Sequence, residues 1–448
     1  MNNEGTSATR SPYSVIYMKY IITKTEEMNG TQIVPGSKSE TIRALVFSVL
    51  SEGISEIKNF LNCDDTETAL RVLKDIGVHT SRQPNKVIIK SAGLPIKTKI
   101  NKINTGNSGI TTRFILPMLG LRENNDLPVI FDCGEQMRMR PIISLVNALN
   151  NLGMNITFLK KHGTYPLSVK GALAGGTTSV DGTISQYLSA LLLSLPLAPS
   201  DSIITVKNLH ERPYVEMTLQ YLDSLGVSYS HRKVKNTDIY KIKGNQKYFG
   251  FKKNISGDFS SASCLIVAGC VIKGKIVLEG LNMKSSQGDK KLIEILQKMG
   301  ADIRISKTKI TIIGGKKLIG VSIDANNIPD LVPALAVIAT RASGKTKIYN
   351  VAQARLKETD RIRSMSLGLR RMGARVEEHK DGLTVYESVL TGSTIQGFDD
   401  HRTVMAFVIA GMIADGKTTV NDAEAVNKTF PNFYQLIKAL GANIKLEK

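Results

Sequence analysis

The chain repeats one phrase six times: a helical stretch, then an aliphatic residue or methionine with a glycine, then a short run that indicates a strand. Its six forms are VLKDIGVHT, ALNNLGMNI, YLDSLGVSY, ILQKMGADI, GLRRMGARV and LIKALGANI. The phrase recurs about every 73 residues, and its glycines are Gly77, Gly153, Gly226, Gly300, Gly373 and Gly441. Because glycine readily takes the left-handed conformation that ends a helix, each phrase predicts an amphipathic helix followed by a strand.

A second series of six helices lies out of phase with the first. Each begins with small polar residues and continues almost wholly apolar: SETIRALVFSVL, SGITTRFILPML, SQYLSALLLSL, SSASCLIVAGCV, DLVPALAVIAT and DHRTVMAFVIAG. Their first residues are Ser39, Ser108, Ser185, Ser260, Asp330 and Asp400. A helix that is apolar on every side must be buried on every side. Each repeat therefore contains one amphipathic helix, one buried helix and several strands.

The six repeats predict an α+β fold of two domains with three repeats each, since 448 residues exceed what one ordinary core holds. The third repeat ends near KYFGFKKNISGD, which suits a passage between domains, and VPGSKS is the other candidate passage. We expect residues 35–255 to form an N-terminal domain, and residues 18–34 with 256–448 a C-terminal domain. Residues 1–17 are polar and rich in Ser and Thr, so we expect a disordered leader ahead of an alternative start at Met18.

The charge of the chain indicates the kind of ligand. A net charge of +20 favours anionic partners. The basic residues are dispersed and there is no tryptophan to stack on bases, so small polyanions are a better match than nucleic acid. Helix starts carry free N–H groups and partial positive charge, and six of them facing one another would form an anion-binding cleft between the domains. Apolar runs stay well short of the roughly 18 residues of a membrane span, so we expect a cytoplasmic protein without a membrane partner.

Several charged motifs near these helix starts are candidates for binding and catalysis. PGSKSETIRAL places Lys38 and Arg43 at the first start but lacks the upstream glycine of a nucleotide P-loop. RLKETDRIR, at 355–363, also has the alternating charge of a solvent-exposed helix face. Lys428 and His401 have ordinary interpretations too, as a loop lysine and a structural hydrogen-bonding residue. The four cysteines show neither a CxxC pair nor a histidine at metal-ligand spacing, so no metal site is expected.

Eleven short motifs, taken in order, resemble those of the 5-enolpyruvylshikimate-3-phosphate synthase family of enolpyruvyl transferases. They are VPGSKSETIR, NCDD, GNSGITTR, MRPI, ISQYLSALL, RPYVEMT, GDFSSAS, IPD, RLKETDR, DDHR and KTFP. The resemblance extends from about residue 20 to residue 445 in matching order and spacing. It implies two domains, each of three βαβαββ units around buried parallel helices, in an enolpyruvyl transferase-like inside-out α/β barrel.

The resemblance also implies a reaction. Shikimate 3-phosphate and phosphoenolpyruvate would give the enolpyruvyl ether and phosphate by addition and then elimination, a step in the biosynthesis of chorismate and the aromatic amino acids. The family implies neither a metal nor an organic cofactor. We therefore expect a monomeric enzyme whose partners are these two small-molecule substrates.

Carried over motif by motif, the resemblance assigns residues to each substrate. Shikimate 3-phosphate would contact Lys38, Ser39, Arg43, Ser185, Gln186, Tyr214, Asp330, Gln353 and Lys357. Phosphoenolpyruvate would contact Lys38, Gly109, Arg140, Gln186, Arg361, Arg402 and Lys428. Asp330 would take the proton of the attacking 5-hydroxyl, and Glu358 would protonate the methylene carbon and later remove that proton. Lys38 would touch both substrates and counts with these two carboxylates as catalytic.

The chain departs from the family pattern at some of these positions. Ile184-Ser185 stands where a double serine is usual, so one phosphate hydroxyl is missing or is replaced by Thr183. Glu211 stands where serine is frequent, and Gln353 stands where asparagine is frequent. Contacts to shikimate 3-phosphate at these positions are therefore expected to differ from those of the family.

Two further departures lie around the second buried helix, where Ile110 and Phe114 replace the usual threonine and proline. A branched apolar side chain beside Gly109 would shift the helix start and narrow the phosphoenolpyruvate pocket. Glyphosate is the family inhibitor that occupies this pocket. We therefore expect glyphosate to bind weakly.

Three other functions compete with this interpretation. UDP-N-acetylglucosamine enolpyruvyl transferase shares the fold and the donor, but its loop cysteine would stand where this chain has Glu135, and KETDR belongs to the shikimate branch. An RNA-terminal phosphate cyclase has related repeats and would suit the positive charge, but it has no use for the KTFP and DDHR motifs. A basic nucleic-acid-binding repeat protein is the non-enzymatic alternative, and its binding would depend steeply on salt.

Overall fold

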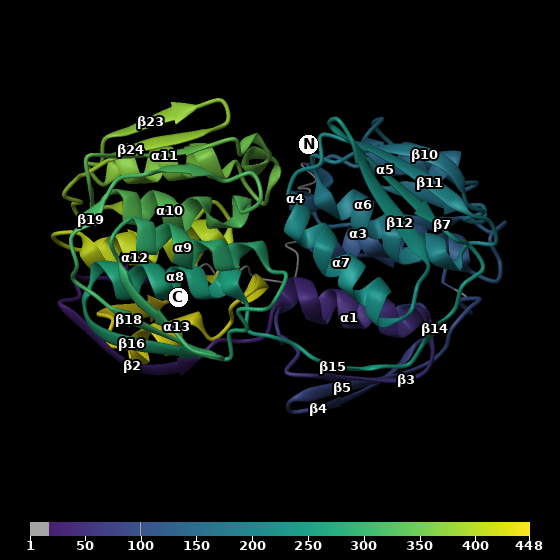
Figure 1. Ribbon diagram of the computed structural model, residues 1–448, viewed down its shortest axis with the longest axis horizontal. Coiled ribbons are helices and arrows are strands. Elements are labelled where there is room, and N and C mark those ends of the chain that lie inside the picture. Colours follow the sequence, from purple (N-terminus) through teal and green to yellow (C-terminus); the bar gives the residue numbers. More distant parts are fainter. Residues whose placement is uncertain (1–17, 99) are drawn as a thin grey trace, which may run out of the picture.

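The computed structural model describes residues 18–98 and 100–448, which form two lobes lying side by side (Figure 1). The first lobe has its core among residues between Ile42 and Ile255, and the second lobe has its core between Tyr20 and Val34 and between Phe259 and Ile444. The predicted α+β fold of two domains is confirmed. The domain bounds at 34/35 and 255/256 stay a prediction, and the predicted leader at 1–17 lies outside the described residues.

Three sheets of the first lobe share one strand pattern, a parallel pair followed by two antiparallel neighbours. Their orders are β14-β3-β5-β4, β6-β7-β9-β8 and β10-β11-β13-β12, and β15 also pairs with β3. The strands are β3 (Ser51–Lys58), β4 (His79–Gln83), β5 (Lys86–Ala92), β6 (Lys102–Asn104), β7 (Val129–Asp132), β8 (Asn155–Phe158), β9 (Leu167–Lys170), β10 (Gly176–Asp181), β11 (Ser202–Lys207), β12 (Tyr229–Val234), β13 (Thr237–Ile242), β14 (Tyr248–Phe249) and β15 (Lys252–Asn254). Buried and exposed residues alternate along strands such as β13, so one face of the sheet packs on the core.

The second lobe repeats the same pattern three times, in the orders β2-β16-β18-β17, β20-β22-β24-β23 and β25-β26-β1-β27. The strands are β1 (Lys19–Ile22), β2 (Glu27–Ile33), β16 (Lys273–Glu279), β17 (Asp302–Ile305), β18 (Lys309–Ile313), β20 (Ser322–Asp324), β22 (Lys345–Tyr349), β23 (Val376–His379), β24 (Gly382–Tyr386), β25 (Thr394–Ile395), β26 (Thr418–Val420) and β27 (Ile444–Glu447). A separate two-stranded sheet joins β19 (Leu318–Ile319) to β21 (Ala342–Ser343). One sheet per repeat therefore accounts for the sixfold sequence pattern.

The two passages of the chain between the lobes lie against each other. Gly36 forms an isolated antiparallel bridge with Gly257, and the Ser37 amide donates to the Ser256 carbonyl over 2.8 Å. A side chain at Gly36 would place its Cβ 2.2 Å from the Asn59 carbonyl oxygen, so only glycine fits. The buried helices that begin just after each passage, one in each lobe, therefore start close together.

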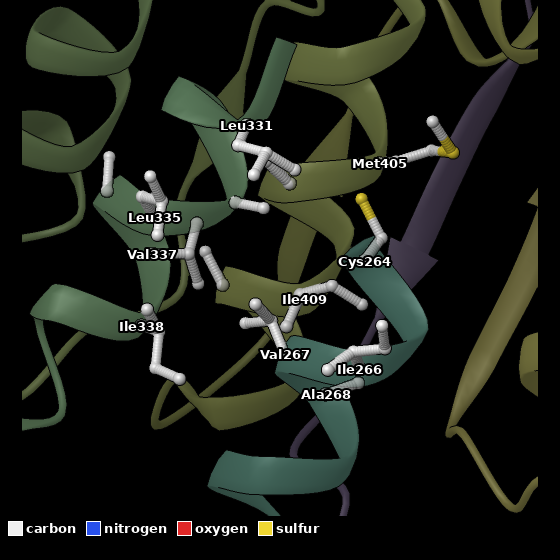
Figure 2. Close-up of a cluster of buried hydrophobic side chains, with 14 of the residues drawn as sticks. Cys264, Ile266, Val267, Ala268, Leu331, Leu335, Val337, Ile338, Met405 and Ile409 are labelled. Carbon is white, nitrogen blue, oxygen red and sulfur yellow. The ribbon is translucent and has the colours of Figure 1, made fainter. Parts of the chain in front are cut away.

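Six helices fill the interiors of the lobes: α1 (Lys38–Leu50), α3 (Gly109–Met118), α6 (Ser185–Ser194), α8 (Phe259–Val271), α10 (Val332–Ala339) and α12 (His401–Ile413). Nearly all of their residues are buried, as their apolar sequences predict. Figure 2 shows how they pack in the second lobe, where Val267 of α8, Leu335 and Val337 of α10 and Ile409 of α12 lie together. These helices fix the positions of the polar residues at their starts.

The amphipathic helices of the six repeats pack against buried helices or against strands of the sheets. They are α2 (Asp64–Asp75), α5 (Ile143–Asn151), α7 (Arg212–Ser224), α9 (Lys291–Lys298), α11 (Arg361–Arg371) and α13 (Phe433–Ala439). The repeated glycine after each helix has a φ between 71° and 107°, which confirms the predicted helix ends. Shorter helical turns are α4 (Glu135–Arg138), η1 (Leu119–Leu121), η2 (Leu195–Leu197), η3 (Gly288–Lys290), η4 (Pro329–Leu331), η5 (Ala352–Leu356) and η6 (Ala423–Lys428). Within the described parts of the chain, every helix is too short or too polar to cross a membrane.

Candidate active site

A cavity lies between the lobes, at the starts of buried helices from both of them. We call it the interlobe cavity, and it is lined by residues from α1, α3, α6, α7, α11 and α12 and from the loops beside them. The predicted site residues in its lining are Lys38, Ser39, Arg43, Gly109, Arg140, Ser185, Gln186, Tyr214, Asp330, Lys357, Glu358, Arg361 and Arg402. Residues more than 300 positions apart in sequence thus meet in one place.

Lys38 stands at the start of α1, where the Ser37 hydroxyl accepts a hydrogen bond from the Glu40 amide and caps the helix. Its amide donates to Asp258 Oδ2 of the second lobe over 3.1 Å, and its Nζ lies 3.0 Å from Asp65 Oδ2. Burial lowers the pKa of Lys38, but Asp65 and Glu358 outweigh burial and raise that pKa above its ordinary value. The ammonium group therefore stays charged inside the cavity.

Arg361 binds three carboxylates at once. Its Nη1 lies 2.6 Å from Asp330 Oδ1, its Nη2 2.8 Å from Glu358 Oε2, and its Nε 2.8 Å from Asp400 Oδ2. Burial opposes ionisation of Asp330 and Glu358, but Arg361 and neighbouring cations, Arg140 among them, outweigh it and hold both pKa values below their ordinary range. Both acids are therefore ionised in the free cleft.

Other cations of the site have nitrogens without a partner. Within residues 18–98 and 100–448, no hydrogen-bond acceptor contacts Nε or Nη1 of Arg402, Nε of Arg140, or Nε and Nη2 of Arg113. These guanidinium groups are buried, and an unpaired buried donor is costly. Arg43 is buried too, and it donates to Thr218 Oγ1 over 2.8 Å and to the carbonyls of Ser39 and Tyr214. Burial lowers the pKa of Arg43 to about 10, which leaves it charged at neutral pH.

The sequence of the chain is similar to those of known enzymes along nearly its whole length. Residues 22–437 match the family model of EPSP synthase (3-phosphoshikimate 1-carboxyvinyltransferase). The chain belongs to the EPSP synthase family. A 3-phosphoshikimate 1-carboxyvinyltransferase of Acetivibrio thermocellus is 42% identical over 93% of this chain and 97% of its own length. The protein of that name from Methanococcus maripaludis strain C5 is 38% identical over 95% of this chain and 99% of its own.

Solved structures of the family share the whole fold. EPSP synthase from Acinetobacter baumannii superposes with a TM-score of 0.80 at 26% identity, over 96% of this chain and all of that chain. The predicted membership in the 5-enolpyruvylshikimate-3-phosphate synthase family is therefore confirmed. The family match over residues 22–437 spans both lobes and includes all the residues that line the interlobe cavity.

Two residues assigned through the family motifs lie outside the cavity lining. Gln353 is buried in η5, and its Nε2 donates to the Asn326 carbonyl over 2.8 Å. Lys428, at the end of η6, donates from Nζ to Gln136 Oε1 of the first lobe over 2.5 Å. Gln136 Nε2 in turn donates to the Asp399 carbonyl, so this pair links the lobes. Lys428 still contributes to lowering the pKa of Glu358, which indicates that its charge acts on the site.

Three residues at the site were not assigned to either substrate from the sequence, although Arg113 and His401 stand at buried-helix starts that the sequence marks as candidates. Arg113 Nη1 donates to Gln186 Oε1 over 2.7 Å and so orients the Gln186 amide. Asp289, which follows the SSQG stretch, is buried, and its Oδ2 accepts from the Ser260 hydroxyl. His401 lines the cavity, and burial together with Arg402 holds its pKa well below the ordinary value, so the imidazole is neutral. Arg113 stands in the GNSGITTR motif, whereas nothing in the local pattern marks Asp289.

Proposed function

We propose that this member of the EPSP synthase family transfers the enolpyruvyl group of phosphoenolpyruvate to the 5-hydroxyl of shikimate 3-phosphate, releasing phosphate. The observation that carries the proposal is the concentration of basic side chains around the interlobe cavity. Lys38, Arg43, Arg140, Lys357, Arg361 and Arg402 all line it. The two substrates together bring two phosphates and two carboxylates, and buried cations are the groups that bind them.

The first substrate, shikimate 3-phosphate, is proposed to lie against the first lobe and the facing loops. Its proposed contacts are Lys38, Ser39, Arg43, Ser185, Gln186, Tyr214, Asp330, Gln353 and Lys357. Arg43 supports this assignment because its guanidinium is charged and is held by hydroxyl and carbonyl groups. Among residues 18–98 and 100–448 no carboxylate pairs with Arg43, so its charge is available to an anionic substrate.

Phosphoenolpyruvate is proposed to lie closer to the second lobe. Its proposed contacts are Lys38, Gly109, Arg140, Gln186, Arg361, Arg402 and Lys428. The unpaired nitrogens of Arg402 and Arg140 support this assignment, since a bound anion would satisfy them. Gly109 supports it as well, because a Cβ there would lie 2.5 Å from Arg140 Nη1 and push the guanidinium away.

The chemistry is proposed to use two carboxylates. The 5-hydroxyl oxygen bonds to C2 of phosphoenolpyruvate, its proton passes to Asp330, and C3 takes a proton from Glu358. In the second half, Glu358 removes a proton from C3 while the bond from C2 to the phosphate oxygen breaks and phosphate leaves. Asp330 is ionised beside Arg361 and Lys357 and can therefore accept a proton, and substrate anions that neutralise these cations would raise its proton affinity.

Glu358 needs a proton that it lacks in the free cleft. Arg140 and Arg361 hold its pKa low when no other anion is present. Substrate phosphate and carboxylate groups would neutralise the same cations, and this raises the proton affinity of Glu358 before C3 is protonated. The acid is thus expected to become functional only in the complex with both substrates.

Phosphate release from shikimate 3-phosphate and phosphoenolpyruvate tests this function. We expect turnover when both substrates are present, without an added metal or organic cofactor. We also propose that the enzyme is a monomer and acts in the cytoplasm. The Lys38→Met and Asp330→Ala variants are expected to lose turnover, whereas Lys24→Met on the surface keeps it. Lack of turnover by the wild type, or equal turnover with UDP-N-acetylglucosamine, would overturn the proposal.

A further inference from the structure

Glu211 places a carboxylate among the donors proposed to hold shikimate 3-phosphate. It precedes α7 in the first lobe and is 3% exposed. Its Oε2 accepts from the Ser185 hydroxyl over 2.7 Å, and its Oε1 pairs with Nζ of Lys357 from the second lobe. The Glu211 carboxylate thus accepts from a hydroxyl and an ammonium group. A bound phosphate group would use the same two kinds of donor. The protein thus fills part of its own anion site.

The backbone of Glu211 is fixed in this position. Its φ is 53°, in the left-handed region, and its amide lies 3.4 Å from the Asn326 carbonyl of the second lobe. The next amide, that of Arg212, donates to Asn327 Oδ1 over 3.2 Å. These contacts hold the backbone in place, so an entering anion is expected to displace the carboxylate by rotating the Glu211 side chain.

The pair also links the lobes. Lys357 Nζ lies 4.0 Å from Asp330 Oδ1, so Glu211 is its near partner and Asp330 its distant one. Loss of one partner of a largely buried ion pair strongly destabilises the protein, because the other charge stays buried and uncompensated. Glu211 therefore favours the closed cleft when substrate is absent, and it supplies the negative charge that a substrate would otherwise provide.

We infer that Glu211 determines affinity for the phosphorylated substrate, as an internal anion that the 3-phosphate must displace from Lys357 and Ser185. The inference rests on the proposed function. Displacement leaves two negative groups near one lysine, and like charges in a buried site repel. A chain with a neutral side chain at this position would bind shikimate 3-phosphate more tightly and would hold its free cleft less firmly closed.

Two variants separate charge from shape. Glu211→Asn removes the carboxylate and suits a left-handed backbone, and Glu211→Gln keeps the length of the side chain. Glu216→Gln is the matched control, because Glu216 lies on α7, the helix that Glu211 precedes, and is exposed. The measurements are KM for each substrate, calorimetric binding of shikimate 3-phosphate, and Tm with and without that ligand.

We expect Glu211→Asn to lower both KM and Kd for shikimate 3-phosphate by about tenfold, with a smaller effect for Glu211→Gln. KM for phosphoenolpyruvate stays within about twofold of the wild type. Tm of the free protein falls, while the rise in Tm on adding shikimate 3-phosphate becomes larger. A purely structural residue would lower Tm without improving binding, so opposite changes in the two quantities identify a displaced anion.

Unchanged or weaker binding of shikimate 3-phosphate by both variants would overturn the inference. The proposed function would still stand in that case if the two variants turn over both substrates. The proposed function fails instead if the wild type neither binds shikimate 3-phosphate nor releases phosphate. If Glu211→Asn does not fold, the calorimetric Kd of Glu211→Gln for shikimate 3-phosphate decides alone. A Kd equal to or above that of the wild type would then contradict the inference.

Discussion

Tyr214 of the first lobe donates its phenol to Asp330 of the second, with 3.2 Å between Oη and Oδ2. The same Oη lies 3.4 Å from Asp289 Oδ2. Burial raises the pKa of Tyr214 well above its ordinary value, and the nearby carboxylates add to this, so the phenol keeps its proton. One neutral side chain of the first lobe therefore contacts two acids of the second lobe, the proposed base Asp330 and the buried Asp289.

Removing this phenol tests the connection. Tyr214→Phe keeps the ring but deletes the donor to Asp330, and a hydrogen bond to a charged group contributes about 1.5–3 kcal/mol. We expect kcat/KM for shikimate 3-phosphate to fall by roughly 10- to 100-fold. Steady-state kinetics measure this. Tyr229→Phe is the control, because Tyr229 donates to the exposed Asp223, and equal kinetics for both variants would contradict the connection.

Asp289 predicts a pH dependence of stability. Burial, with Asp330 adding to it, raises the pKa of Asp289 from 3.8 to about 7. In this pH interval the unfolded chain has lost the proton that the folded chain keeps. The contribution of Asp289 to the free energy of unfolding is therefore fully present below about pH 4. It is lost as pH rises toward 7, by up to about 1.4 kcal/mol per pH unit.

Asp289→Asn removes this titration. The free energy of unfolding of the wild type minus that of the variant, from urea titrations at several pH values, is expected to fall between about pH 4 and pH 7. Asp126→Asn, at an exposed site, is expected to give a difference that does not change with pH. A constant difference for Asp289→Asn as well would show that Asp289 is ionised throughout.

The parts of the fold that follow from local chemistry were predictable. Gly373 ends its helix with a φ of 88° because glycine tolerates that conformation, and α8 is buried because its sequence is apolar all round. The helix starts follow from the same patterns, and they bring most of the assigned residues to the interlobe cavity. These features depend on residues within one turn or one helix of each other.

Pairings across the cleft were not predictable in the same way. Glu211 and Lys357 are 146 positions apart, and no period or motif states that their side chains meet. Asp289 is a single acid after a loop, and burial raises its pKa at a place that Tyr214 of the first lobe also contacts. Lys428 contacts Gln136 because η6 and α4 approach each other, a relation set by how the lobes close. Such contacts depend on the packing of the two domains, which periodicity does not encode.

Arg361 is expected to be important for stability as well as for turnover. Arg361→Ala leaves Asp330, Glu358 and Asp400 without their shared partner, and breaking a buried ion pair costs about 3–5 kcal/mol. Urea unfolding measures the change. Arg363→Ala, two residues along and 62% exposed, is expected to change stability by less than about 0.5 kcal/mol. Similar losses in both would mean that the three carboxylates find other partners.

Ile110 is expected to weaken glyphosate binding. Its side chain is 4% exposed, lines the interlobe cavity and packs in the core of the first lobe, directly after Gly109. Ile110→Thr reduces the apolar bulk at this helix start, so the concentration of glyphosate that halves turnover is expected to fall. Ile110→Val keeps the branched apolar shape and is expected to match the wild type. If glyphosate inhibits the wild type as strongly as it inhibits Ile110→Thr, Ile110 does not weaken glyphosate binding.

Gly109 is expected to set the space available to phosphoenolpyruvate. A Cβ at this position would lie 2.5 Å from Arg140 Nη1 and 2.9 Å from Arg113 Nη1, distances at which the guanidinium groups must shift. Gly109→Ala should therefore move Arg140 and, through Arg113, loosen the hydrogen bond that orients Gln186. We expect KM for phosphoenolpyruvate to rise by about tenfold or more, while Kd for shikimate 3-phosphate changes less. Because α3 begins with an ordinary helical backbone at this residue, Tm should change little, and a large loss of Tm with an unchanged KM would instead make Gly109 a packing residue.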